Sequence, residues 1–433
     1  MTTAIQLDQE DPFQPLTSLF AMPVAHHGQT AIYLNGNSLG PMPKNMTEAL
    51  VAECESWGHF GVRGHFAKEH PWVSYHERAS HSLARLIGAK PQEVVATGTL
   101  TANLHFTFIS FYRPTKNRYK IICLAGFPSD TYAIRSQIQQ RLKTLHDFYE
   151  QYPLTLEDAI IEIKPDNNGY ISMDTFKQVL QAHGNSTALV WIEAVHFLTG
   201  QYFNVPELTA LAHTYGCKIG LDLAHAIGNV PLHLHSWNVD FAVWCSYKYL
   251  SAGPGAIAGL YIHEQYFTDP KIVRFAGWWG HNKKTRFQLP HEFDPIATAE
   301  SWQVSNPGIL LLTALCEALA IFDQVDLQRL REKNQRLTAY LEQLLLNELA
   351  EHVRIITPSN PTERGCQLSF HLLHNGPSFD IEKRLWEQGI ICDTRGNLVR
   401  VAPMGLYTTF QDVFVFVEKL KEQVMASHKQ TKA

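Results

Sequence analysis

The 433-residue sequence lacks several features that mark specialised classes of protein. It has no run of lysine or arginine, and its formal net charge is -5, so nothing indicates nucleic-acid binding. No apolar stretch reaches the roughly 18 residues that a membrane-spanning helix requires. The opening segment MTTAIQLDQEDPF has no apolar signal core. These absences predict a cytoplasmic protein.

Paired cysteine motifs are also absent. The seven cysteines are scattered without a CxxC pair, and several lie inside apolar, strand-like runs. Such cysteines are typical of small buried side chains rather than of a disulfide framework. With 45% hydrophobic and 18% charged residues, the composition is that of an ordinary globular protein, and the length suggests two or three domains.

Short apolar runs alternate with helix-like segments from about residue 97 onward. This alternation is typical of βαβ units and predicts an α/β fold with a mainly parallel sheet. Residues 274–307 break the alternation and are expected to form a long loop, after which a smaller α+β set follows. We therefore predict an N-terminal arm (1–44), a large domain (45–310) and a small C-terminal domain (311–433).

Two of the strand-like runs end in residues that carry chemistry. Asp222 closes the run 217–223, and Lys248 follows the run 239–246. In open α/β sheets, ligands bind outside the carboxyl ends of the strands, so these two side chains are expected to share one site. An acid that pairs with a pyridinium nitrogen and a lysine that forms a Schiff base indicate a pyridoxal phosphate (PLP) enzyme. The alternative is a surface lysine at a strand end.

Other segments are compatible with such a site, but each has a simpler interpretation. The stretch ATGTLTANLHF enters a helix whose N-terminus, with Leu100 and Thr101, would bind phosphate. Phe127 could stack on a planar cofactor, with Ser129 and Asp130 at the next helix start. Ordinary helix caps and a core phenylalanine would give the same pattern. Arg400 offers a fork that matches a carboxylate, or else a surface ion pair.

A metal site is the competing hypothesis. Asp222 and His225 have ligand-like spacing, and further histidines occur at positions 233, 235 and 281. His233 and His235 alternate on one strand-like face without a clear set of partners. The sequence therefore favours no metal.

Ordered motifs along nearly the whole chain resemble the kynureninase family, a branch of the aspartate aminotransferase-like (fold-type I) PLP enzymes. The motifs include YLNGNSLGPMPK, ATGTLTANLHF, FPSDTYAI, GLDLAHAIGNV, CSYKYL, GWWGHNKKTRF and VRVAP. The resemblance implies hydrolysis of L-kynurenine or 3-hydroxy-L-kynurenine to L-alanine and anthranilate or 3-hydroxyanthranilate. This reaction belongs to tryptophan degradation and the synthesis of NAD precursors.

The resemblance also implies roles for individual residues. Lys248 would bind the cofactor aldehyde, Asp222 would pair with the ring nitrogen, and Tyr247 would contact the phosphate and serve as an acid. The other cofactor-binding residues would be Leu100, Thr101, Phe127, Pro128, Ser129, Asp130, His225, Trp278 and Asn306. The substrate-binding residues would be Ser38, His65, Asn306 and Arg400.

Three further expectations follow from the resemblance. Trp278 and Asn306 would reach the site across a dimer interface, so a homodimer with shared active sites is implied. His65 and Asn306 favour activity on both substrates, with a preference for the hydroxylated one. Glu193 departs from the family, whose members more often carry a small hydroxyl residue there, and the sequence leaves its role open.

Three rival hypotheses remain. Another fold-type I enzyme, such as a cysteine desulfurase or an aminotransferase, would share Lys248 and Asp222, although no cysteine lies in an evident catalytic loop. A binding protein that has lost its cofactor is disfavoured by the intact pair. A metal hydrolase built on Asp222, His225 and His281 is the weakest alternative.

Overall fold

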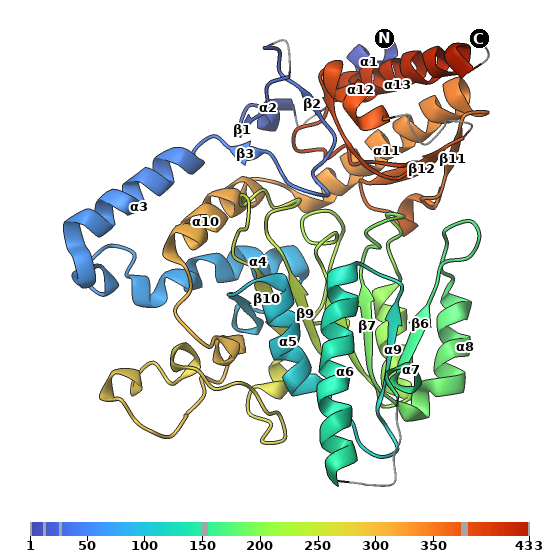
Figure 1. Ribbon diagram of the computed structural model, residues 1–433. Coiled ribbons are helices and arrows are strands. Elements are labelled where there is room, and N and C mark those ends of the chain that lie inside the picture. Colours follow the sequence, from blue (N-terminus) through green and yellow to red (C-terminus); the bar gives the residue numbers. More distant parts are fainter. Residues whose placement is uncertain (1, 12–13, 26–27, 149–154, 374–379, 432–433) are drawn as a thin grey trace.

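A seven-stranded sheet forms the centre of the larger part of the molecule (Figure 1). The computed structural model describes residues 2–11, 14–25, 28–148, 155–373 and 380–431. The strands lie in the order β4 (Val94–Ala96), β10 (Gly259–Ile262), β9 (Phe241–Trp244), β8 (Lys218–Asp222), β7 (Thr187–Glu193), β5 (Lys120–Leu124), β6 (Ile160–Ile163). Only β10 runs against its neighbours within this sheet. The prediction of an α/β fold with a mainly parallel sheet is confirmed.

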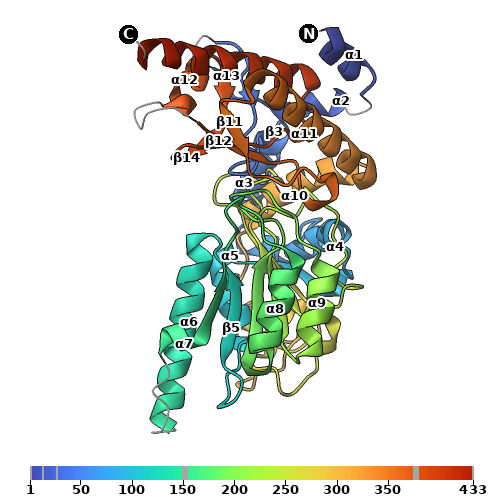
Figure 2. The same cartoon turned by 90° about the vertical axis from the view of Figure 1, so that its right-hand side faces the viewer.

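Helices cover both faces of this sheet (Figure 2). Val190 and Ile192 of β7 belong to one apolar core, whereas Leu189 and Trp191 belong to the core on the opposite face. A parallel strand covered on both sides needs apolar residues at every position. This explains why continuous apolar runs became the central strands. The covering helices are α8 (Met173–His183) and α9 (Val205–Thr214) on the first face, and α5 (Leu100–Phe111) and α6 (Pro128–Phe148) on the second.

A smaller antiparallel sheet lies at one end of the molecule, with three helices beside it (Figure 1). Its strand order is β11 (Val353–Ile355), β12 (Leu368–Leu372), β15 (Leu398–Val401), β14 (Asp393–Arg395). The helices are α11 (Leu327–Leu349), α12 (Ile381–Glu387) and α13 (Phe410–Thr431). These elements form a third apolar core.

The N-terminal arm is attached to this smaller part. Its strand β2 (Ile32–Tyr33) pairs in parallel with β13 (Ile390–Ile391). The carboxylate of Asp8 accepts hydrogen bonds from the backbone N–H groups of Phe410 (2.7 Å) and Gln411 (2.9 Å) at the start of α13. The first helix of the chain, α1 (Thr2–Gln9), is therefore packed against the last one, α13. The domain borders at residues 44 and 310 stay a prediction.

The remaining elements lie between these parts or on their surface. Residues 274–307 contain only short 3-10 helices, as expected for a long loop. Across the described residues, no helix combines the length and apolar character that a bilayer crossing requires. The elements are α1 (Thr2–Gln9), α2 (Gln14–Thr17), β1 (Phe20–Ala21), β3 (Met42–Pro43), α3 (Met46–Phe60), α4 (Ser80–Ile87), α7 (Leu156–Ala159), α10 (Ile309–Asp323), and the 3-10 helices η1 (Gly61–His65), η2 (Trp72–Ala79), η3 (Pro91–Glu93), η4 (Gly184–Ser186), η5 (Glu264–Tyr266), η6 (Trp278–Gly280), η7 (Arg286–Gln288), η8 (Ala299–Trp302) and η9 (Pro361–Glu363).

Candidate active site

The acid and the lysine singled out by the sequence meet at the carboxyl ends of two neighbouring strands. Asp222 is the last residue of β8, and Lys248 lies in the loop after β9. The Nζ atom of Lys248 is 2.9 Å from Nε2 of His225, which lies in the turn after Asp222. Burial raises the pKa of the Asp222 carboxyl, and the nearby charge of Lys248 opposes that rise. The structure therefore brings Asp222, His225 and Lys248 into one site.

His225 is the uncharged member of this group. Its side chain is buried, and burial lowers its pKa well below the ordinary value, with a further lowering by the charges of Lys248 and Arg400. A neutral imidazole accepts the hydrogen bond that Lys248 Nζ donates. The turn is held in place because Asn229 Nδ2 donates to the backbone oxygen of His225 (2.9 Å).

Three buried carboxyl groups, those of Asp130, Glu193 and Asp222, lie on the sheet side of the site. Loss of hydration on burial is the largest effect on each and raises all three pKa values. The pKa of Asp130 lies well above its usual range, because Asp222 and Glu193 add like charge to the effect of burial. Trp191 Nε1 donates to Asp130 Oδ2 (3.0 Å), which opposes this rise.

The first turns of helices α5 and α6 meet beside these residues. Thr101 Oγ1 and Ser129 Oγ, one from each helix, are 2.8 Å apart. Helix N-termini present free N–H groups and a partial positive charge, so two of them with hydroxyl groups form a binding place for an anion. Leu100 and Pro128 are the first residues of α5 and α6 and contribute to the same two turns.

Phe127 presents its ring to the site. The ring is 42% exposed and lies 5.8 Å from Lys248 Nζ. Phe197 supports it by an edge-to-face contact, with ring centroids 5.4 Å apart. A half-exposed aromatic ring beside the lysine offers a face on which a planar group can stack.

Arg400 comes from the smaller part of the molecule and is held in place by Asp393. The two residues are direct cross-strand partners on β15 and β14. Arg400 Nε donates to Asp393 Oδ1 (2.8 Å), its Nη2 donates to Asp393 Oδ2, and its Nη1 donates to the backbone oxygen of Phe197 (2.8 Å). The guanidinium is therefore fixed in orientation, and it is close enough to act on the pKa of His225.

The N-terminal arm touches the loop that carries the lysine. Gly40 N–H donates to the backbone oxygen of Tyr247 (2.8 Å), and a Cβ atom at Gly40 would lie 2.4 Å from the backbone oxygen of Lys248. Only glycine allows this approach. Ser38 lies in the preceding turn, where its N–H donates to the Asn35 oxygen. Tyr247 is half-buried, and burial raises the pKa of its phenol above the usual range.

Three residues expected in the site lie in other segments. His65 is in η1, directly after α3, and Trp278 and Asn306 are in the loop 274–307. His65 Nδ1 is bonded to the oxygen of Val62 (3.0 Å). Trp278 is 45% exposed, and its Nε1 donates to the Arg286 oxygen (3.3 Å). Asn306 is exposed. Among the described residues of one chain, no hydrogen bond joins any of the three to Lys248. Their role in the site stays a prediction that depends on a second chain.

The histidines considered as metal ligands are used elsewhere. His281 accepts from Asp294 N–H (3.1 Å) and bonds Thr285 Oγ1 (3.0 Å), so both ring nitrogens serve its own loop. His235 Nδ1 pairs with Glu93 Oε1 (2.9 Å). Within the part of the chain that the structure describes, two groups have ligand-like spacing, Glu93–His235–His263 and His76–Glu77–Glu300. In the second, Lys283 already pairs with both acids.

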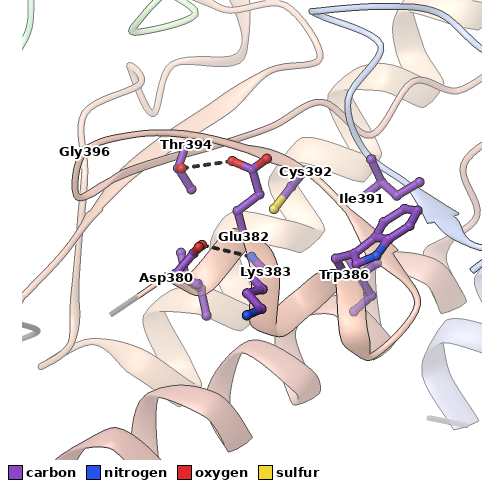
Figure 3. Close-up of a pocket in the computed structure, with 10 residues that line it drawn as sticks. Asp380, Glu382, Lys383, Trp386, Ile391, Cys392, Thr394 and Gly396 are labelled. Atoms are coloured by element: carbon purple, nitrogen blue, oxygen red, sulfur yellow. Dashed lines mark hydrogen bonds between the residues drawn. The ribbon is translucent and has the colours of Figure 1, made fainter. Parts of the chain in front are cut away.

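A cavity of about 640 Å³ occurs in the smaller part of the molecule, between α12 and β14 (Figure 3). Glu382 accepts a hydrogen bond from Thr394 Oγ1 (3.0 Å) within it, and Asp380 caps α12. None of the residues expected to act in the site lines this cavity. The cavity is therefore separate from the group around Lys248.

Sequence reasoning left three contributors to the site without a role. Glu193 and Trp191 lie at the end of β7, and Asp393 anchors Arg400. The sequence carries no signal for the first two, because the β7–β8 register that places Glu193 opposite Asp222 is set only on folding. The signal for Asp393 was its position in the strand that precedes Arg400.

Comparison with known proteins gives one consistent result. The family model for aminotransferase class-V matches residues 32–411. Kynureninase from Myxococcus xanthus is 44% identical over 96% of this chain and 96% of its own length. Kynureninase from Flavobacterium psychrophilum is 42% identical over 98% of this chain and 97% of its own length.

Solved structures share the fold at much lower identity. A cysteine desulfurase from Thermococcus onnurineus has a TM-score of 0.71 at 18% identity, covering 92% of this chain and 95% of its own. The cystine C–S lyase C-DES, in complex with its product cysteine persulfide, has a TM-score of 0.73 at 19% identity, covering 90% and 97%. These similarities establish the architecture alone.

Proposed function

The chain belongs to the kynureninase family of the class-V aminotransferases, and from this premise we propose that it hydrolyses the Cβ–Cγ bond of L-kynurenine or 3-hydroxy-L-kynurenine. The products are L-alanine and anthranilate or 3-hydroxyanthranilate. The observation that carries the proposal is identity of 41–44% to several kynureninases over nearly the entire chain. The rival desulfurases share the fold at only 15–19% identity.

The site fits pyridoxal 5'-phosphate as the cofactor. Lys248 offers the amine for the aldehyde, Asp222 a buried acid for the ring nitrogen, and Phe127 a ring face. The hydroxyl groups of Thr101 and Ser129, which are hydrogen-bonded to each other, are the groups that we propose to bind the phosphate. When bound, PLP supplies an electron sink for the substrate carbon next to the amine.

The side chains around Lys248 are arranged to move protons. Lys248 Nζ is the base placed to take the proton from the substrate Cα, and neutral His225 accepts a hydrogen bond from it. In the overall reaction, water supplies the oxygen that makes Cγ a carboxylate, and Cβ gains a proton and becomes the methyl group of alanine. Tyr247 is our candidate donor of that proton, because its raised pKa keeps the phenol protonated.

Arg400 is the group proposed to bind the substrate carboxylate. Asp393 occupies Nε and one hydrogen of Nη2, which fixes the plane of the guanidinium before substrate arrives. A fork held in this way loses little conformational entropy on binding a carboxylate.

Incubation of the PLP-loaded protein with L-kynurenine tests the function. We expect release of anthranilate, followed by its fluorescence, and stoichiometric L-alanine. Of the two substrates, 3-hydroxy-L-kynurenine is expected to have the higher kcat/KM, because His65 and Asn306 could both hydrogen-bond its phenol hydroxyl. A large preference for plain kynurenine would exclude that role, and alanine released from cysteine in place of kynurenine would overturn the proposed reaction.

The proposed working form is a homodimer. Large apolar side chains are exposed on η1, on the residue that follows it and on the loop 274–307, including Val62 (79% exposed), Phe66 (62%) and Leu289 (71%). Phe66 and Phe287 pack edge-to-face across these two segments, with centroids 5.4 Å apart. Contiguous exposed apolar surface of this kind is typical of an interface. A second chain seated there would bring its own His65, Trp278 or Asn306 toward the site.

Sedimentation of the purified protein is expected to give twice the 49.1 kDa chain mass. The Leu289→Asp substitution is expected to raise the dimer dissociation constant at least about tenfold, because it places a charge in an apolar interface, and kcat should fall with the dimer fraction. The control is Leu346→Asp, on the exposed face of α11 (53% exposed), which should leave both unchanged. A fully active monomer would contradict the shared active site.

A further inference from the structure

Glu193 connects two loops that border the active site. It is the last residue of β7 and is only 4% exposed. Its Oε1 accepts a hydrogen bond from the backbone N–H of Phe127 (2.6 Å), and its Oε2 accepts one from the backbone N–H of Phe197 (2.7 Å). The loop approaches so closely that a Cβ atom at Gly126 would lie 2.5 Å from Oε1. One side chain thus holds the loop after β5 and the loop after β7 together.

Each of these loops carries a group that faces the site. The first presents the ring of Phe127, 5.8 Å from Lys248 Nζ. The second presents the backbone oxygen of Phe197, which accepts from Arg400 Nη1 (2.8 Å). The rings of Phe127 and Phe197 are also in contact. One hydrogen bond therefore links Glu193 to Phe127, which carries the stacking ring. Two hydrogen bonds, through the backbone of Phe197, link Glu193 to the guanidinium of Arg400.

Only an ionised carboxylate fits between two N–H donors. A glutamine or a protonated acid would turn a donor toward one of the backbone N–H groups and leave it unsatisfied. Burying the charge of the Glu193 carboxylate costs free energy, because the carboxyls of Asp222 and Asp130 lie next to it. Burial and the charge of Asp222 together raise the pKa of Glu193 to about 7, against the opposing effect of the two N–H bonds and Lys248.

We propose that Glu193 is a positioning residue of the reaction: its carboxylate sets the separation of the two loops, and so places Phe127 against the cofactor ring and Arg400 against the substrate carboxylate. The inference rests on the proposed function only for the identity of the substrate. It assigns a role to a residue whose type departs from the one expected of the family.

The Glu193→Gln variant tests the proposal. We expect about a tenfold increase in both the dissociation constant of PLP for the apo-protein, measured by absorbance, and KM for the substrate, with a change in kcat below about threefold. Wild-type kcat/KM is expected to fall as the pH drops below about 7, because Glu193 is then protonated and releases one loop. The titratable and charged groups that face Glu193 are Asp222, Asp130 and Lys248. The glutamine variant should lack this acidic limb.

The matched control is Glu93→Gln. Glu93 is equally buried and also accepts two backbone N–H bonds, from Lys90 and Glu264, but it precedes β4 at the opposite end of that strand from the site. The Glu93→Gln substitution should lower thermal stability about as much as Glu193→Gln does, but it should leave the PLP dissociation constant, KM and the pH profile unchanged. A second variant, Glu193→Asp, keeps the charge but is too short to reach both loops, so its PLP dissociation constant should fall between those of wild type and Glu193→Gln.

The outcomes separate the two proposals. A weaker affinity for PLP in Glu193→Gln but not in Glu93→Gln supports the positioning role even where kynurenine is not cleaved, and in that case the proposed function alone fails. If Glu193→Gln matches Glu93→Gln in PLP affinity, KM and pH profile, the carboxylate is a structural group and the inference is overturned. The inference is equally overturned if Glu193→Asp binds PLP as weakly as Glu193→Gln.

Discussion

Lys248→Ala is expected to lose at least about 10³-fold in kcat/KM for kynurenine, because the substitution removes the side chain that we propose both to bind the cofactor aldehyde and to act as the base at the substrate Cα. The same variant should lack the absorbance band of lysine-bound PLP after cofactor is added. The loss follows from the position of Nζ, 2.9 Å from the neutral imidazole of His225 and 5.8 Å from the ring of Phe127. A spectrum and an anthranilate fluorescence assay measure both effects.

Lys419→Ala provides the control for this experiment. Lys419 lies on α13, where it pairs with Glu422 at the surface, so its removal should leave the spectrum and the rate unchanged. Reduction of the wild-type holoenzyme with borohydride should attach the cofactor to Lys248, as read by peptide mass spectrometry. Persistence of the band in Lys248→Ala, or attachment at another lysine, would show that the site is assigned to the wrong residue.

Asp222→Asn is expected to lower kcat/KM by about 10²- to 10³-fold while preserving the shape of the site. Asparagine can still accept the bond from Ala224 N–H, which now goes to Asp222 Oδ1 (2.7 Å), but it cannot hold a proton on the cofactor nitrogen by charge. An uncharged ring withdraws electrons less well, so proton removal from the substrate slows. The rate of Cα-proton exchange with solvent deuterium measures this step directly.

The same substitution is expected to stabilise the apo-protein at high pH. Burial raises the pKa of Asp222 above its unfolded value near 3.8, so the folded state binds this proton more tightly. The stability this provides is present below pH 3.8 and is lost as the pH rises through the folded pKa. Once the pH is above the folded pKa, the buried charge is unfavourable, and Asp222→Asn should then raise Tm by about 2 °C or more.

Asp240→Asn should show the opposite behaviour. His213 and Lys218 hold the pKa of Asp240 below its ordinary value despite burial, so its stabilising effect is present at neutral pH and is lost as the pH falls. We expect Asp240→Asn to lower Tm at pH 8 and to leave kcat/KM within about threefold, because Asp240 lies at the start of β9, away from Lys248. A higher Tm for Asp240→Asn, or a lower one for Asp222→Asn, would contradict the assignment of charge at these two positions.

Much of the sheet could be predicted from local pattern. A strand covered on both faces has no solvent side, so β7 and β8 appear in the sequence as uninterrupted apolar runs, and their ends are marked by the first acid. Asp222 and Lys248 could be placed together because parallel strands end at a common edge. The reversed direction of β10 could not be predicted, because its four buried residues would read the same way in either orientation.

The sequence by itself determined the chemistry of this protein: an acid and a lysine at strand ends, hydroxyls at two helix starts, and a run of motifs that places the chain in its family. The tertiary structure alone decided which side chains lie next to these site residues. Strand register places Glu193 beside Asp222, antiparallel pairing places Asp393 opposite Arg400, and packing places Asp130 near both Asp222 and Glu193. Local pattern reports whether a residue is buried. The neighbour it meets there depends on residues distant in the chain, and only folding brings them within reach.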